Sequence, residues 1–117
     1  MNIKKYDIIK VNLNPKKWSA QAGIMPCIII QSNLFNQYSP TLVVVPLTSK
    51  VKKLFPSEFM ITPSKINWLI EKSRFLWSQI MTVDKRFVFE KVGSLEKKYH
   101  NDLDNAISKS LDLGNDF

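Results

Sequence analysis

The sequence has few of the residues from which many catalytic sites are built. Its 117 residues include three glycines, one cysteine and one histidine. Three scattered glycines form no glycine-rich phosphate-binding loop, and one cysteine forms neither an internal disulfide nor a CxxC zinc motif. No carboxylates or histidine show metal-ligand spacing. We therefore expect no metal and no cofactor, Cys27 as a buried thiol, and His100 as a surface residue of the final helix.

Long apolar runs are also absent. No run approaches the ~18 residues of a membrane-spanning helix, and the opening residues contain no apolar segment typical of a signal peptide. The shares of hydrophobic residues, 44%, and of charged residues, 23%, are ordinary for a globular protein. We expect one domain spanning residues 1–117, in the cytoplasm and without membrane contact.

The charge is strongly positive and unevenly distributed. The formal net charge is +7. Residues 1–95 carry a charge of +9, and residues 96–117 carry −2. A basic body suits a surface that binds polyanions such as nucleic acid, although lysine-rich proteins are also basic for solubility alone.

Hydrophobic patterning predicts a mainly β fold with one long helix. Strands are expected at residues 6–13, 26–32, 41–49, 57–63, 74–84 and 87–93. Residues 33–40 suit one or two helical turns ended by Pro40, and residues 64–73 suit an exposed connection. Pro46, inside an otherwise β-branched run, indicates a bulge or an edge. The sum is a compact, strongly curved antiparallel fold.

The closing helix is expected over residues 94–111, with Ser94 as its N-cap and Gly114 ending it. Its apolar residues recur at helical spacing and form one face. That face comprises Tyr99, Leu103, Ala106, Ile107 and Leu111.

Several segments, in order and spacing, resemble the MazF/PemK family of toxin–antitoxin ribonucleases. They are "DIIKVNLNP", the positions Ser19, Gln21, Gly23, Pro26 and Gln31, the run "NLFNQYSPTLVVVPLTSK", the block "SQIMTVDKR", and "VGSL" before the final helix. The resemblance covers the chain from Tyr6 almost to its end. It implies a small SH3-like, MazF-like antiparallel β-barrel with a C-terminal helix.

The resemblance also implies a function. Members pair into homodimers, cut single-stranded RNA without metal in a groove near the dimer interface, and are blocked by an antitoxin whose tail occupies that groove. Thr48 matches the family's active-site threonine. Ser19, Gln21, Gln79, Thr82 and Asp84 also match family positions.

Four charged positions of the family pattern are substituted here. The family's catalytic arginine before Pro26 is Met25, and a second arginine is Met81. The acids of the family pattern are Ala20 and Ser78. Methionine offers no donor to a charged phosphorane, and loss of one preorganised donor costs ~10²–10³ in rate. Loss of acid–base help costs a further ~10²–10⁴, so we expect impaired or absent cleavage.

Basic and aromatic residues can still bind RNA or a partner. In an extended strand, Arg74 would share a face with Leu76 and Ser78 and could replace the missing cation. Trp18 suits either base stacking or packing, Trp68 either an interface or packing, and Trp77 the core. The candidate RNA- or partner-binding residues are Lys16, Lys17, Trp18, Ser19, Gln21, Arg74, Ser78, Gln79, Met81, Thr82, Lys85 and Arg86.

Three functions remain open from the sequence. The chain can be a MazF/PemK-like protein that binds single-stranded RNA or an antitoxin-like peptide with little cleavage. It can be an active metal-independent endoribonuclease with a relocated catalytic cation. It can also be a protein-binding regulator that does not contact nucleic acid.

Overall fold

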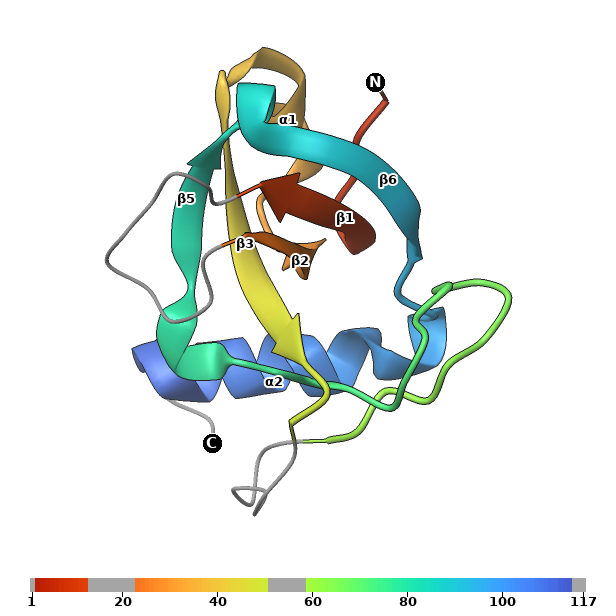
Figure 1. The fold of residues 1–117 in the computed structure, drawn as a ribbon. Coiled ribbons are helices and arrows are strands. Elements are labelled where there is room, and N and C mark those ends of the chain that lie inside the picture. Colours follow the sequence, from red (N-terminus) through yellow and green to blue (C-terminus); the bar gives the residue numbers. More distant parts are fainter. Residues whose placement is uncertain (1, 13–22, 51–58, 115–117) are drawn as a thin grey trace.

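A computed structural model describes residues 2–12, 23–50 and 59–114. Within these ranges, no helix is both long enough and apolar enough to cross a membrane. The chain forms a six-stranded antiparallel sheet that curves over a C-terminal helix, as Figure 1 shows. The strands are β1 (Asp7–Asn12), β2 (Ile24–Ile29), β3 (Thr41–Thr48), β4 (Arg74–Phe75), β5 (Met81–Asp84) and β6 (Val88–Ser94).

The strand order is β4-β3-β2-β1-β6, and β5 also pairs with β3. Among the described residues, no pairing joins β6 to β4 or β5, so the sheet is curved but not closed. The expected mainly β fold with a C-terminal helix is therefore confirmed, in an open form of the barrel. β3 pairs with three strands, with β2 along one edge and with β4 and β5 along the other.

Apolar side chains are buried on both faces of the central strands. One cluster packs against the helix α2 (His100–Leu111) and includes Ile28, Val45 and Leu103. A second cluster lies on the opposite face of β2 and includes Met25, Cys27 and Ile29. Because alternate residues of a strand face opposite sides, burial on both sides explains why residues 24–30 are almost continuously apolar.

The strand expected over residues 74–84 is wrong as a single element. A 3-10 helix, η1 (Trp77–Gln79), separates β4 from β5. Both short strands pair with the same edge of β3, at Leu47–Thr48 and at Thr41–Val44 respectively. Pro46 lies between the two pairings, and its carbonyl accepts the Leu76 N–H at 2.7 Å. Proline has no N–H to donate to a neighbouring strand. The partner of β3 on this edge therefore changes from β5 to β4 at the residue where a backbone hydrogen bond would be lacking.

Two other expected elements differ from the structure. In the described part of 57–63, only an isolated bridge between Ile61 and Ser73 is present. Ser94 does not cap the final helix; it ends β6, and its hydroxyl donates to Asp7 Oδ1 at 3.0 Å. A 3-10 turn, η3 (Lys97–Tyr99), follows before α2 begins.

The apolar face of the final helix is confirmed for most of its length. Leu103 and Ala106 are buried, and Tyr99 and Ile107 pack against the same cluster, whereas Leu111 is 51% exposed. The helix ends at Asp112, whose left-handed φ of 55° replaces the expected Gly114 stop. Trp77 also packs against this cluster, as expected.

The short helix α1 (Asn33–Tyr38) is capped by Ser32, whose hydroxyl accepts the Phe35 N–H. It ends before Pro40, as predicted. A third 3-10 turn, η2 (Lys85–Phe87), connects β5 to β6.

Candidate functional site

Met25 and Thr48 line one open cavity of about 290 Å³ at the end of the central strands. The β2–β3 register pairs Cys27 with Pro46. Continued by two residues on each strand, that register sets Met25 opposite Thr48. The fold therefore brings together the two positions at which the sequence predicts catalytic residues. The cavity is lined by Met25, Pro26, Leu47, Thr48, Ser49, Lys50, Leu69, Ile70, Glu71 and Ser73.

Thr48 contributes a hydroxyl group to the lining of this cavity. Its Oγ1 accepts the backbone N–H of Lys50 at 3.1 Å. The backbone bond occupies a lone pair and leaves the hydroxyl proton available for a ligand oxygen. Thr48 is half-buried, so the group is oriented yet accessible.

Arg74 is the Cα partner of Thr48 in the antiparallel β3–β4 pair. Directly opposite residues of such a pair place their side chains on the same face, with Cβ atoms about 5 Å apart. The neighbouring pair, Leu47 and Phe75, is buried in the first cluster. By alternation, Thr48 and Arg74 share the other face. Arg74 itself is half-buried and does not line the cavity.

The Met25 side chain packs in the core and also lines the cavity. Met25 is only 6% exposed and belongs to the second apolar cluster. Met81, where the family resemblance implies a second arginine, is half-buried and packs against that same cluster. Each of the two positions therefore holds a thioether, a weak acceptor with no donor, where the resemblance implies a guanidinium.

Two charged residues of the cavity, Lys50 and Glu71, were not predicted from the sequence. Glu71 lies in the connection 64–73, which the pattern indicated only as exposed. The hydroxyl of Ser73 donates to the Glu71 carbonyl at 2.9 Å and fixes this part of the connection. The sequence signal was weak, because Glu71 becomes a site residue only once β4 is paired with β3.

The connection 64–72 is held in place by a buried amide. The Asn67 side chain is fully buried, and its Nδ2 donates to the Thr62 carbonyl and to Glu96 Oε1, both at 2.9 Å. Its Oδ1 accepts the N–H groups of Ser64 and Leu69, each at 3.0 Å. Asn67 therefore fixes the residues that form one wall of the cavity.

Gly93 allows β6 to approach this connection closely. A Cβ at Gly93 would lie 2.8 Å from the Asn67 carbonyl oxygen and would also overlap that of Ile66. Ser94 N–H donates to the Ile66 carbonyl at 3.0 Å across the same approach. Only glycine fits between these two backbones.

The remaining predicted site residues of the 74–84 region lie away from the cavity. Ser78 and Gln79 are exposed on η1, and Met81 and Thr82 lie on β5 opposite Val44 and Val43 of β3. The expectation that Arg74 and Ser78 share a strand face is wrong, because η1 rotates the chain after Leu76.

Lys85 and Arg86 lie at the far end of β3 from Thr48. Asp84 pairs with Thr41, seven residues from Thr48, which is about 23 Å along a strand. Lys85 Nζ donates to the Asn36 carbonyl at 2.6 Å, and Arg86 pairs with Asp84 at 3.0 Å. The hydrogen bond from Arg86 lowers the pKa of Asp84. Neither cation can reach the cavity from this position.

Five predicted binding residues lie outside the described residues. They are Lys16, Lys17, Trp18, Ser19 and Gln21.

The single cysteine and the single histidine are both packed against other parts of the fold. Cys27 is buried, and burial raises the pKa of its thiol to about 12. The His100 ring is partly buried rather than a free surface group, and it stacks on Tyr6 with centroids 3.6 Å apart. Its Nε2 lies 2.9 Å from the Leu95 carbonyl oxygen. Within residues 2–12, 23–50 and 59–114, no group of three His, Cys, Asp or Glu residues could hold a metal ion.

Comparison with known proteins defines the class to which this fold and cavity belong. Residues 4–111 match the model of the PemK-like, MazF-like toxin of type II toxin–antitoxin systems. The chain is 37% identical over 112 residues to "Endoribonuclease MazF" of Staphylococcus saprophyticus, covering 95% of this chain and 92% of that protein. It is 35% identical over 114 residues to "Endoribonuclease MazF" of Staphylococcus epidermidis, covering 97% and 94%.

Solved structures show the same fold at lower identity. A mycobacterial endoribonuclease in complex with its cognate antitoxin aligns with a TM-score of 0.78 at 18% identity, covering 97% of this chain and 98% of that one. MazF from Deinococcus radiodurans aligns with a TM-score of 0.76 at 17% identity, covering 96% and 98%. The chain belongs to the PemK-like, MazF-like toxin family.

Proposed function

We propose that this chain is a cytoplasmic MazF-like homodimer that binds single-stranded RNA and an antitoxin-like peptide in the Met25–Thr48 cavity, with strongly impaired cleavage. The observation that carries the proposal is the packing of Met25 and Met81 in the apolar core, beside a cavity that keeps the Thr48 hydroxyl. Met25 and Met81 both contribute to one apolar cluster, while Thr48 keeps an oriented hydroxyl in the cavity.

Impairment follows from the chemistry of metal-free RNA cleavage. The 2′-hydroxyl must lose a proton, the 5′-oxygen must gain one, and the phosphorane between them carries negative charge. A hydroxyl such as that of Thr48 is a poor acid and a poor base near neutral pH. With no guanidinium at positions 25 and 81, the loss from one missing donor alone is ~10²–10³ in rate.

Binding has separate support. Residues 1–95 carry a charge of +9, which attracts a polyanion. The cavity is open and combines hydroxyl groups with Lys50. An antitoxin-like partner is supported by the structural relative that is described as complexed with its cognate antitoxin. One basic surface attracts both an acidic peptide and an RNA strand, so the two ligands are expected to compete for the groove.

Homodimer formation is supported by the exposed apolar surface. Among the described residues, ten large apolar side chains are at least 51% exposed. Three of them, Leu34, Phe35 and Tyr38, lie together on the short helix α1, and a local group of exposed apolar side chains suits a contact between protomers. Light scattering should give twice the chain mass of 13.6 kDa.

The binding proposal is tested by fluorescence anisotropy with a labelled, mixed-sequence single-stranded RNA in chelator. We expect affinity that falls as salt rises, because lysine and arginine contacts to phosphates release counterions. Addition of an acidic antitoxin-like peptide should displace the RNA. Absence of RNA binding at low salt, together with salt-insensitive binding of a protein partner, would instead support a regulator without nucleic-acid contact.

A second candidate is an active endoribonuclease with a relocated cation. The register that sets Arg74 opposite Thr48 favours it, since a guanidinium on that face is close to the Thr48 hydroxyl. A wild-type protein that cuts RNA in chelator, and that loses this activity on Arg74→Ala, would establish the second candidate over the first.

A further inference from the structure

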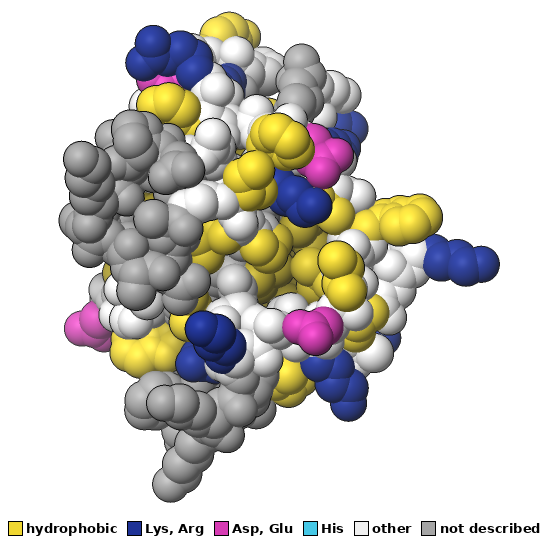
Figure 2. Space-filling model, in the orientation of Figure 1, with side chains coloured by type: hydrophobic (Ala, Val, Ile, Leu, Met, Phe, Trp, Pro, Cys, Tyr) yellow, Lys and Arg dark blue, Asp and Glu magenta, His cyan; other side chains and the backbone are white. Residues whose placement is uncertain are grey.

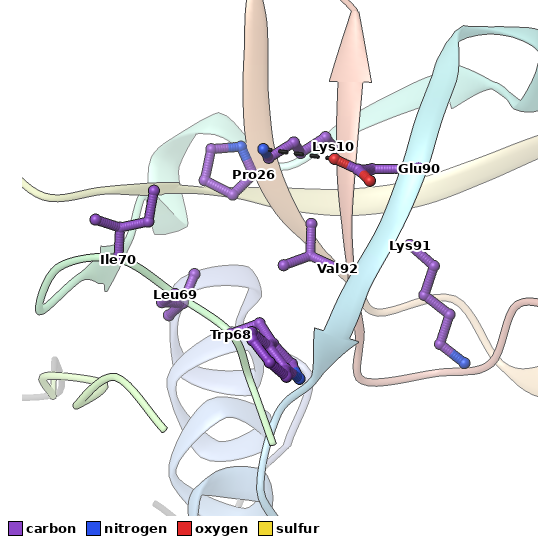
Figure 3. Close-up of a pocket in the computed structure, with 8 residues that line it drawn as sticks. All are labelled: Lys10, Pro26, Trp68, Leu69, Ile70, Glu90, Lys91 and Val92. Carbon is purple, nitrogen blue, oxygen red and sulfur yellow. Dashed lines mark ion pairs between the residues drawn. The ribbon is translucent and has the colours of Figure 1, made fainter. Parts of the chain in front are cut away.

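A second recess lies next to the Met25–Thr48 cavity. It has a volume of about 360 Å³ and lies between the sheet face of β1, β2 and β6 and the connection 64–72. Figure 2 shows hydrophobic side chains gathered in a hollow on this face of the molecule, with charged side chains at its edge. Figure 3 shows the residues that line it, among them Lys10, Pro26, Trp68 and Val92.

Trp68 is held in this recess in an unfavourable backbone conformation. Its φ is 55°, in the left-handed region that favours glycine. A non-glycine residue there costs about 1–3 kcal/mol, which persists only where the surroundings impose it. The neighbouring Asn67 imposes it through the hydrogen bonds on either side. Trp68 is nevertheless 63% exposed as a residue, so its burial does not explain the strain.

A cation stands on the opposite side of the recess from this indole. Lys10 reaches over the recess beside Pro26 and pairs with Glu90, with Nζ 3.5 Å from Oε1 (Figure 3). Both side chains of this pair are substantially exposed, at 39% and 52%. An exposed pair contributes little to stability, so Lys10 can exchange the carboxylate for a phosphate.

The recess and the cavity are adjacent. Pro26, Leu69 and Ile70 line both of them, so a strand that leaves the cavity across these residues reaches the recess. We propose that the recess is a nucleotide subsite, in which one unpaired base of a single-stranded RNA stacks on Trp68 while Lys10 contacts the adjacent phosphate. This inference rests on the proposed RNA binding and deepens it by adding a subsite beside the Thr48 cavity.

The arrangement favours RNA over a second copy of the chain as the occupant. An exposed aromatic ring combined with a lysine is the pairing that sequence-tolerant single-strand binding uses. A second copy seated on the recess would bury Lys10, Glu90 and Lys91, and burial of charged side chains is costly. Occupation by a second copy is therefore a distinct outcome of the test.

The test measures RNA affinity of the full-length protein in chelator for wild type, Trp68→Gly, Trp68→Phe and Phe89→Ala. Trp68→Gly suits the left-handed backbone and should fold at least as well as wild type, as a thermal melt will show. We expect it to weaken RNA binding by about 5- to 150-fold, which corresponds to ~1–3 kcal/mol for one stacked base. Trp68→Phe should stay within a few-fold of wild type. Phe89 is similarly exposed, at 59%, and lines neither hollow, so Phe89→Ala should change nothing.

Two further readouts separate stacking from other causes. An RNA that carries the fluorescent base 2-aminopurine should lose emission on binding wild type and retain it with Trp68→Gly. Lys10→Gln should lower the slope of log affinity against log salt by about one, since one phosphate contact is lost.

The outcomes are decisive in each case. If wild type binds RNA and Trp68→Gly binds equally well, the subsite is wrong although the proposed function stands. If wild type binds no RNA, the proposed function and this inference fall together. A third outcome is that Trp68→Gly converts the dimer to a monomer in solution and loses RNA affinity only at concentrations where it is monomeric. That result would show that the recess is an interface between copies, and the subsite would again be wrong.

Discussion

Thr48 and Arg74 face each other directly across the β3–β4 pair, on the side of the sheet away from the α2 cluster. This register sets a guanidinium opposite the Thr48 hydroxyl, just outside the residues that line the cavity. In a binding protein with little cleavage, we expect that guanidinium to contact RNA phosphate rather than the reacting oxygen atoms.

Arg74→Ala should therefore weaken RNA binding about tenfold or more, as removal of a charge-assisted contact to phosphate does. Arg74→Lys should recover part of the affinity, because it keeps the charge but not the planar fork of donors. Anisotropy titrations at two salt concentrations measure both. Exposed Arg86, 81% accessible at its side chain and at the far end of β3, supplies the control as Arg86→Ala. Equal losses for the two variants would contradict a specific role for Arg74.

Tyr6 and Asp104 connect the start of the chain to the final helix. The Tyr6 hydroxyl donates to Asp104 Oδ2 at 2.7 Å. Burial and the Asp104 carboxylate raise the pKa of Tyr6 to about 12. The protonated phenol is thus favoured in the folded state, so its contribution is complete below pH 10 and is lost as pH rises through 12.

Tyr6→Phe should lower the free energy of unfolding by about 1 kcal/mol at neutral pH. It should also remove part of the fall in stability between pH 10 and pH 12. Urea unfolding across this range measures both effects. A Tyr6→Phe variant with the same alkaline decline as wild type would show that another group titrates there.

Asn67 organises the wall that the cavity and the recess share. Asn67→Ala removes four hydrogen bonds and leaves part-buried backbone groups without these partners, which should cost about 1–3 kcal/mol. RNA affinity should fall as well, because Leu69 to Glu71 are no longer held. Asn105→Ala, on the exposed side of α2, is the matched control. Unchanged stability in both variants would mean that the connection does not depend on this amide.

Cys27 reports on the second apolar cluster, to which Met25 also belongs. Because Cys27 is fully buried and its thiol pKa is about 12, an alkylating reagent at pH 8 should label it only on unfolding. Mass spectrometry of native and urea-treated protein measures the labelled fraction. Rapid labelling of the native protein would show that the cluster around Met25 opens readily.

Much of the fold could be predicted because its core strands carry strong local patterns. The run around Val44 is β-branched, and the apolar face around Leu103 recurs at helical spacing, so both elements were predicted, although the helix begins at His100 and not at residue 94. The split of residues 74–84 could not be predicted. It arises because two short strands pair with different stretches of one edge of β3, and this long-range arrangement has no local signal in the sequence.

The candidate site could be predicted at Met25 and Thr48, whose positions follow from the family resemblance. The positions of Glu71 and Trp68 in the two hollows could not be predicted in the same way. Their connection shows no regular pattern, and its shape depends on the buried Asn67 and on the close approach at Gly93. The expected cap at Ser94 failed because tertiary hydrogen bonds to Asp7 and Tyr6 keep residues 94–95 extended.

The most direct test of impaired cleavage is a chelator-treated cleavage assay on mixed-sequence single-stranded RNA. Wild type is compared with the double variant Met25→Arg and Met81→Arg, and melts check the variant, since both methionines pack on one cluster. The account predicts that the double variant cuts at least ~10²-fold faster than wild type, as one restored donor would allow. Wild type that cuts as fast as the double variant, and that stops cutting on Thr48→Ala, would contradict it.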